Sequence, residues 1–302
     1  IKPKVSTGLL VFNNLIDAAS AVPQLVADGF ETAELLDATS IKVAQRSGAV
    51  AESLAKIDVT EQAALLVEFT GESEAELADR FAKARPHLER MPLNSPVDMT
   101  SDPKERTLLW AARNSLYAAV AGARPTGTNA LLEDVAVPVA ELGETCQQLS
   151  DLFTDHNYPG SVIFGHAKDG NVHFMLNEQF RDAEKLQRYR RFTEDMVDLI
   201  LGHDGSLKAE HGTGRIMAPY VERQFGPELY GMMRHVKALA DPHGMLNPGV
   251  IITDDPDLYV EHLKVAEEIE KVADRCVECG YCEPVCPSRD LTLTPRPVSY
   301  TH

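Results

Sequence analysis

Basic side chains are in short supply: 29 lysines and arginines stand against 46 aspartates and glutamates, and the formal net charge is −17. Nucleic-acid-binding proteins need basic surfaces for phosphate contacts, so this composition argues against that class. No stretch approaches the roughly 18 consecutive apolar residues of a membrane span, and the opening IKPKVSTGLL has too short an apolar run for a signal peptide. We therefore expect a cytoplasmic protein, with peripheral attachment at the inner face of the membrane left open.

The sequence also lacks a starting Met, so we expect the 302 residues to be a piece of a longer protein.

Cysteine is scarce as well, and four of the five cysteines lie within eleven positions near the end. A disulfide framework in a chain of this size would be spread out, whereas such crowding is typical of a metal or cluster site. We therefore expect a reducing compartment. The fifth cysteine, Cys146, stands alone in a predicted helix and is expected to be a small buried packing residue.

Apolar residues at strand and helix spacing alternate through the chain. They predict strands at residues 8–11, 32–36, 63–69, 133–137 and 160–165, and helices after Asn14, from Glu72, over 139–153 and over 178–202. The rhythm predicts an α+β fold of two ferredoxin-like split units, with an antiparallel sheet and helices on one face. A charged helix at 256–274 is predicted to link a substrate domain, residues 1–255, to the cysteine-rich segment, residues 256–302.

The segment GHAKDGNVHFML contains Asp169-Gly170, a strong signal for a two-residue hairpin turn. Such a turn would place His166 directly opposite His173, with Cβ atoms about 4.5–5.5 Å apart. Two imidazoles at that separation can share a divalent ion. The alternative is a pair of hydrogen-bonded sheet histidines, because a metal site also needs a third ligand.

The segment AEHGTGR supplies that third ligand, since Glu210 and His211 sit side by side in a loop closed by glycines. One carboxylate and two imidazoles leave an open coordination position, as catalytic ions require. His211 can then serve as a general base, because the pKa of an imidazole lies close to working pH. The alternative is a surface loop with an incidental acid and base.

The tail carries the pattern C-x2-C-x2-C-x3-C-P, formed by Cys276, Cys279, Cys282 and Cys286. In bacterial ferredoxins the first three thiolates of this pattern bind one [4Fe–4S] cluster and the fourth binds a second cluster. A structural zinc site is the alternative, although zinc sites typically use two separated pairs. The chain ends sixteen residues after Cys286, so we expect the Fe–S module to be truncated and the first cluster to be held poorly.

Three motifs in order, GHAKDGNVHFML, AEHGTGR and MRHVKALADPHGMLNPG, resemble the C-terminal substrate domain of FAD-linked 2-hydroxy acid dehydrogenases, the D-lactate dehydrogenase and glycolate oxidase group. The stretches FNNLIDAASAVPQLVADGFETAELLD and LLEDVAVPVAEL fit the same family, so the resemblance covers most of residues 1–252. It implies FAD as cofactor. No G-x-G-x-x-G loop occurs in the chain, so a missing N-terminal part is expected to bind the flavin, and the fragment alone is expected to be inactive.

The resemblance also assigns roles to single residues. It implies that His166, His173 and Glu210 bind a divalent ion, usually zinc, which holds the hydroxyl and carboxylate oxygens of the substrate. It implies that His211 takes the hydroxyl proton while the α-hydrogen leaves as hydride to the flavin.

Two further roles follow from it. Arg113, in LWAARN, corresponds to an arginine that pairs with the substrate carboxylate, a task suited to its planar fork; the alternative is an ordinary surface charge. Asn247, in NPG, is expected to face the flavin. After the flavin, electrons are expected to pass singly through the Fe–S clusters to a quinone, cytochrome or other carrier.

Two positions depart from the hydroxyglutarate-type members. Met175 stands where they carry an Asn, and Leu132 stands where they carry a Lys that binds a carboxylate. A second substrate carboxylate would be buried without a partner, which is costly. We therefore expect a small monocarboxylate such as D-lactate or glycolate. The alternatives are a metal-dependent hydrolase and a non-catalytic electron-transfer or scaffold module.

Overall fold

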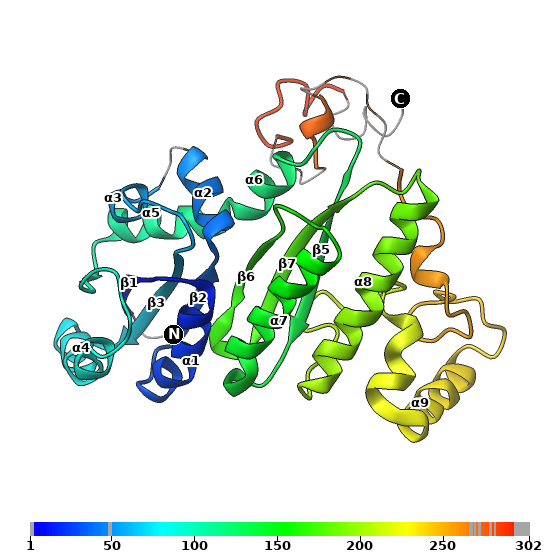
Figure 1. Cartoon of the computed structure of the whole chain (residues 1–302), viewed down its shortest axis with the longest axis horizontal. Coiled ribbons are helices and arrows are strands. Elements are labelled where there is room, and N and C mark those ends of the chain that lie inside the picture. The colour runs from blue at the N-terminus through cyan, green and yellow to red at the C-terminus, as the bar shows by residue number, and fades with distance from the viewer. Residues whose placement is uncertain are drawn as a thin grey trace.

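A single sheet of seven strands runs through the chain in the order β4-β1-β3-β2-β6-β7-β5, and every neighbouring pair is antiparallel (Figure 1). The computed structural model describes residues 3–47, 50–265, 268, 270, 273–277, 280 and 282–292. The strands are β1 (Lys4–Phe12), β2 (Thr32–Leu36), β3 (Ala63–Gly71), β4 (Met99–Thr100), β5 (Asn129–Ala136), β6 (Val162–His166) and β7 (Asn171–Glu178).

Helices fill most of the connections between these strands. The α-helices are α1 (Leu15–Ala27), α2 (Ala38–Ser47), α3 (Glu52–Ala55), α4 (Glu74–Leu88), α5 (Pro103–Asn114), α6 (Leu116–Gly122), α7 (Leu142–Asp155), α8 (Ala183–Gly202) and α9 (Val221–Ala240). In the described part of the chain, none of them is both long and apolar enough to cross a membrane.

The chain contains two split units of the same kind. In the first, β3 lies between β1 and β2, and in the second, β7 lies between β5 and β6. The units join edge to edge where β2 pairs with β6, with Glu34 opposite His166. The predicted antiparallel α+β architecture is therefore confirmed.

Side-chain caps fix the starts of several helices. The Asn14 side chain accepts a hydrogen bond from the backbone N–H of Asp17 at 2.8 Å, as its sequence position predicted. Ser73 and Asp182 cap α4 and α8 in the same way. Such caps satisfy donors that the first helical turn leaves without partners.

The pleat of β2 divides the interior into two apolar clusters. Leu35 joins the larger one, with side chains from α1, α4, α7 and α8, whereas Leu36 joins a second one, with side chains from α2, α5 and α6. Successive residues of a strand face opposite sides of the sheet. The helices α2, α5 and α6 thus add a layer on the face where no helices were predicted, because the strands are apolar there as well.

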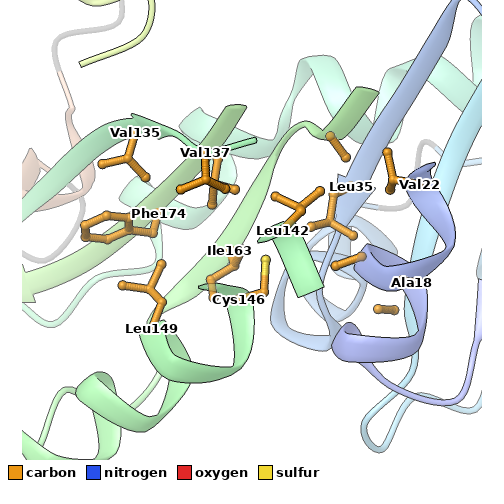
Figure 2. Close-up of a cluster of buried hydrophobic side chains, with 14 of the residues drawn as sticks. Ala18, Val22, Leu35, Val135, Val137, Leu142, Cys146, Leu149, Ile163 and Phe174 are labelled. Atoms are coloured by element: carbon orange, nitrogen blue, oxygen red, sulfur yellow. The ribbon is translucent and has the colours of Figure 1, made fainter. Parts of the chain in front are cut away.

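Cys146 of α7 lies fully buried in the larger cluster (Figure 2). Burial raises the pKa of its thiol to about 12, so the thiol stays protonated. It is a packing residue, as predicted.

The hairpin between β6 and β7 differs from the prediction. His173 lies opposite Phe164 and not opposite His166, a shift of two positions. His166 pairs with Glu34 of the other unit instead. The sequence-based register was therefore wrong.

Contact with the end of β5 explains this register. The turn is a 3-10 turn, Ala167–Asp169, followed by Gly170 in the left-handed conformation with φ 69°. The carbonyl of Gly170 accepts a hydrogen bond from the Val137 N–H at 3.0 Å, and a Cβ at Gly170 would lie 1.9 Å from the Val137 oxygen. This tertiary contact selects a longer turn than the Asp-Gly pair alone predicts.

The helix predicted over 256–274 is absent from the described residues 256–265, which form only the 3-10 turn Leu258–Val260. Tyr259 and Val260 are both buried there, and Tyr259 packs against Tyr189 and Tyr220. The chain leaves the helical conformation directly after this turn, because Glu261 is extended, with φ −82° and ψ 147°, and His262 has a positive φ of 54°. Several later residues of that segment lie outside the described part.

Candidate functional site

Two imidazoles project from the same face of the β6–β7 hairpin. The rings of His166 and His173 are 5.4 Å apart between centroids and meet edge to face at 84°. The register shift does not separate them, because a shift of two residues keeps a side chain on its face. His173 is buried and His166 is partly exposed.

Glu210 reaches both imidazoles from a loop after α8. Its Oε1 atom lies 3.0 Å from His173 Nε2 and 3.4 Å from His166 Nε2. Zinc holds N and O ligands at about 2.1 Å, so ligand atoms of a tetrahedral site lie about 3.4 Å apart. The three residues could therefore hold a divalent ion with one position open toward solvent, since half of the Glu210 side chain is exposed.

Asp134 of β5 fixes the loop that carries Glu210. Its Oδ2 atom accepts the backbone N–H groups of three consecutive residues, Ala209, Glu210 and His211, at 3.1, 2.7 and 2.8 Å. Its Oδ1 atom accepts from the Asn171 side chain at 2.7 Å. These hydrogen bonds hold the pKa of Asp134 below its usual range against the effect of burial.

A buried ion pair anchors the same loop one residue earlier. Lys208 Nζ lies 2.6 Å from Oε2 of Glu133, and both side chains are more than nine-tenths buried. Removing one partner of such a pair leaves an uncompensated charge. Glu133 and Asp134, which are adjacent in β5, therefore both bind this loop and hold it against the sheet.

Each of the two imidazoles has a carboxylate at its far nitrogen. His166 Nδ1 lies 2.6 Å from Oε1 of Glu34, and His173 Nδ1 lies 3.5 Å from Oδ1 of Asp134. A hydrogen-bonded carboxylate, as Glu34 is for His166, orients a metal-binding histidine and makes it a better ligand, whereas His173 Nδ1 has no hydrogen-bond partner among the described residues. The Nε2 atoms of both rings are left to face Glu210.

The protonation of the two rings differs because their surroundings differ. Burial lowers the pKa of His173 to about 4, which keeps that ring neutral, the form that binds metal. The hydrogen bond with Glu34 raises the pKa of His166, opposed by burial.

A second group of candidate ligands overlaps the first: Asp134, His173 and His211 also have ligand atoms within 4.8 Å of one another. The oxygens of Asp134 already accept four hydrogen bonds from protein groups. Glu210, by contrast, has an exposed carboxylate. The first group is therefore the better candidate for an ion.

His211 lies beside this group. Its ring stacks on His173 with centroids 5.0 Å apart and an angle of 14°, and its Nε2 lies 3.8 Å from Oε1 of Glu210. The side chain is partly exposed. It can exchange protons with solvent while it borders the space in front of Glu210.

Arg113 of α5 approaches the group from the other unit. Its Nε donates to Oε2 of Glu34 at 2.8 Å, and its guanidinium lies over the Phe164 ring at 5.2 Å. Glu34 thus bridges Arg113 and His166. Within the described part of the chain, the terminal nitrogens of Arg113 form no hydrogen bond with protein groups, so they remain available to an anion.

The two positions that depart from the hydroxyglutarate-type pattern lie side by side. Leu132 pairs with Met175 across β5 and β7, and both belong to the second apolar cluster with Phe164. This part of the sheet face, next to His173, is therefore apolar.

Asn247 lies apart from the imidazoles, in an exposed loop after α9, with φ 43°. Its carbonyl accepts from the Val250 N–H at 3.2 Å. Asparagine adopts this left-handed conformation more readily than most residues.

The described residues do not bring the cysteines of the tail together as candidate ligands. Cys276 and Cys282 are exposed, and Cys286 is partly buried with its sulfur 3.1 Å from Ser288 Oγ. Cys279 lies outside the described residues.

Sequence reasoning missed four residues of this site: Glu34, Glu133, Asp134 and Lys208. The acidic pair Glu133-Asp134 inside a predicted strand was the available signal, because buried carboxylates in a strand need partners. Glu34 gave no comparable signal, since its role depends on the pairing of β2 with β6.

Comparison with known proteins identifies a family and several relatives of the chain. The family described as "FAD linked oxidases, C-terminal domain" matches residues 1–251. The glycolate oxidase subunit GlcD of Bacillus subtilis is 30% identical over 84% of this chain and 52% of its own length. The mitochondrial D-lactate dehydrogenase [cytochrome] of Kluyveromyces lactis is 27% identical over 83% of this chain and 43% of its own.

A third relative, the D-2-hydroxyglutarate dehydrogenase of Escherichia coli, is 26% identical over 96% of this chain and 31% of its own length. The chain therefore spans about half or less of these relatives. Among solved structures, 4-ethylphenol oxidase from Gulosibacter chungangensis shares the fold, with a TM-score of 0.58 and 13% identity over 83% of this chain and 54% of its own.

Proposed function

This chain belongs to the C-terminal domain family of FAD-linked oxidases, and we propose that it forms the substrate-binding part of a flavin-dependent 2-hydroxy acid dehydrogenase. The favoured substrates are D-lactate and glycolate. The observation that carries the proposal is the convergence of His166, His173 and Glu210 on one point of the sheet, where half of the Glu210 side chain is exposed.

We infer that these three residues hold a divalent ion, and we propose zinc as that ion. The spacing of their ligand atoms and the neutral state of His173 support this inference. When bound, the ion would polarise the substrate hydroxyl and lower its pKa. Glu34 keeps the His166 ring oriented for that purpose, and Asp134 positions the loop of Glu210.

The other side chains have separate tasks. Arg113 binds the substrate carboxylate with its terminal nitrogens while Glu34 holds its Nε. His211 takes the hydroxyl proton and passes it to solvent. Flavin, when bound, would supply the hydride acceptor that oxidises the 2-hydroxy acid to a 2-oxo acid. We assign Asn247 to the flavin-facing side.

The apolar pair Leu132 and Met175 supports a small substrate. A second carboxylate next to these side chains would lose its hydration without gaining a partner. Lactate and glycolate place only a methyl group or a hydrogen there.

We also propose that the tail passes electrons onward through [4Fe–4S] clusters bound by Cys276, Cys279, Cys282 and Cys286. The tail lies against the first domain, because Arg124 Nη2 donates to the Cys276 carbonyl at 3.0 Å and Val277 packs on the second apolar cluster. A quinone or a cytochrome would be the final acceptor, and the name of the Kluyveromyces lactis relative mentions a cytochrome for that protein.

The test is anaerobic reduction of flavin in the complete flavoprotein that contains this chain. We expect D-lactate or glycolate to bleach the flavin, 2-hydroxyglutarate to do so far more slowly, and His211→Gln to slow the reaction by about 100-fold or more. Ester hydrolysis by the 302-residue chain without flavin, lost in His173→Ala, would replace this proposal with a metal-dependent hydrolase.

A further inference from the structure

Helix α5 carries Arg113 but has few buried side chains. Of the twelve residues described for this helix, Leu109 and Ala112 are buried and the others are at least partly exposed. Most of the stability of a helix in a protein comes from packing of its apolar face. Since α5 buries two side chains, one of them an alanine, its position on the sheet depends on polar bonds as well.

Trp110 supplies one of these bonds. It is the one tryptophan of the sequence, and its indole N–H donates to Oε1 of Glu68, in β3, at 2.8 Å. The ring also packs against the apolar cluster that contains Leu66 and Leu109. Glu68 is 9% exposed, so the bond joins the helix to a buried group of the sheet. A buried indole usually has a hydrogen-bond partner, and a charged acceptor makes the bond stronger.

Glu68 is itself held by two further donors. The Thr7 hydroxyl of β1 donates to Oε1 of Glu68 at 2.5 Å, and Nη2 of Arg106 donates to the same oxygen at 3.1 Å. Thr7 is fully buried. The acceptor of the Trp110 bond is thus fixed to two strands, β1 and β3, and does not follow the helix when the helix moves.

Trp110 and Arg113 are three residues apart in α5, and both reach acidic side chains of the sheet. Residues at this interval are neighbours on a helix surface. Arg113 binds Glu34 of β2. Glu34 lies opposite Leu66 of β3, two residues before Glu68, so the two glutamates face α5 from one side of the sheet. A rotation of α5 about its axis would therefore break the Trp110 bond and displace Arg113 together.

The two contacts leave different groups free. The indole has a single N–H group, and Glu68 accepts it. Arg113 donates its Nε to Glu34, and its terminal nitrogens have no protein acceptor within the described residues. Trp110 can therefore set the rotation of the helix, while Arg113 keeps donors for an anion.

We propose that Trp110 is a positioning residue for substrate binding, an inference that rests on the proposed function. Its bond with Glu68 fixes the rotation of α5 and keeps the guanidinium of Arg113 aimed at the carboxylate of the 2-hydroxy acid. Trp110 acts through Arg113 and not on the ion, because the three candidate metal ligands belong to β6, β7 and the loop after α8. Arg106 contributes less, since it lies two turns from Arg113 and a lysine there keeps a cation beside Glu68.

Steady-state kinetics of the complete flavoprotein tests this role. Trp110→Phe removes the N–H donor and keeps an aromatic ring, so we expect the KM for D-lactate to rise about threefold to tenfold, with kcat changed less. Tyr158→Phe is the matched control, because the Tyr158 hydroxyl also donates to a buried glutamate, Glu178, at 2.8 Å. This control should leave KM unchanged. Zn²⁺ binding by both variants should equal that of the wild type, which shows that they fold.

A double-variant cycle with Arg113→Lys separates this inference from the proposed function. In the Arg113→Lys background, Trp110→Phe is expected to raise KM by less than about twofold, because residues that act through one another have non-additive effects. A wild-type KM in Trp110→Phe, an equal rise in Tyr158→Phe, or full additivity with Arg113→Lys would each overturn the role of Trp110. An unchanged KM in Arg113→Lys would overturn that role together with the carboxylate contact. Lack of flavin reduction by D-lactate and glycolate in the wild-type protein would remove the proposed function itself.

Discussion

Oε1 of Glu210 lies 3.0 Å from Nε2 of His173, and both residues depend on Asp134, which binds the loop of one and faces the ring of the other. The candidate site is thereby built from three elements that are distant in the chain: β5, β7 and the loop after α8. Such an arrangement holds ligands in place before any ion arrives, which favours tight binding.

Loss of either ligand is expected to abolish stoichiometric metal binding. His173→Ala and Glu210→Gln should each weaken Zn²⁺ binding to the chain by more than about 100-fold, because each removes a direct ligand of the ion. Residues that only contact the ligands have smaller effects on the affinity. Equilibrium dialysis with metal analysis measures the Zn²⁺ affinity of each variant. The control is His87→Ala, which changes a histidine that is bonded to Asp28 and is not one of the candidate ligands. This variant should bind Zn²⁺ as the wild type does.

Asp134→Asn is expected to lower Zn²⁺ affinity about 10- to 100-fold without removing a ligand. An amide cannot present two acceptor oxygens, so its NH2 group would face either three backbone N–H groups or the Asn171 amide. Asp151→Asn, at an exposed position of α7, is the matched control. Equal affinity in the two variants would argue against a role of Asp134 in placing Glu210.

Arg113→Lys should raise the KM for the 2-hydroxy acid about tenfold or more and change kcat less, because a lysine cannot bind Glu34 and a carboxylate with one planar group. Steady-state kinetics of the complete flavoprotein checks this. Arg106→Lys is a close control, since Arg106 lies on the same helix and binds the acidic Glu68 in a similar way. A KM that does not respond would place the substrate carboxylate elsewhere.

Cys282→Ser is expected to remove about four irons per chain from the complete, anaerobically purified protein, because the thiolate is a cluster ligand in the ferredoxin pattern. Cys146→Ala, which changes the buried cysteine of α7, should leave the iron content unchanged. Iron and acid-labile sulfide analysis measures both. Zinc in place of iron in the wild-type tail would support a structural zinc site instead.

The loop after α9 should depend on pH through Asp241. Hydrogen bonds from Lys237 and from the Leu246 and Met245 N–H groups lower the pKa of Asp241 to about 2 from its usual 3.8. A lowered pKa means that this stabilisation is complete above the ordinary pKa and is lost as pH falls through about 2. The difference in unfolding midpoint between the wild type and Asp241→Asn should therefore be constant above pH 4 and shrink below it; a difference that persists at pH 2 would contradict this.

Local signals in the sequence were enough for most of the framework. The cap at Asn14 and the apolar runs of the strands depend on neighbours in the chain, so pattern and propensity predict them. The strand partner of His166 could not be predicted from neighbours in the chain, because a tertiary contact between Gly170 and Val137 selects the longer turn. The prediction that both imidazoles share a face survived, since side chains on a strand repeat every two residues.

The supporting residues of the site could be predicted least. Glu34 becomes part of it only because the two units join through β2 and β6, and no local pattern encodes that junction. Glu133 and Lys208 likewise meet only after the loop folds onto β5. The candidate ligands lie in short motifs of the sequence, whereas the groups that orient them are defined by tertiary structure.

The junction of β2 with β6 divides the candidate site between the two units. The second unit contains His166, His173 and Glu210, but the first unit supplies Glu34 and Arg113. Under the proposed function, the second unit alone would have the three candidate ligands without the arginine, and the first unit alone would have the arginine without the ligands. The proposed chemistry therefore requires the two units to be joined edge to edge through β2 and β6.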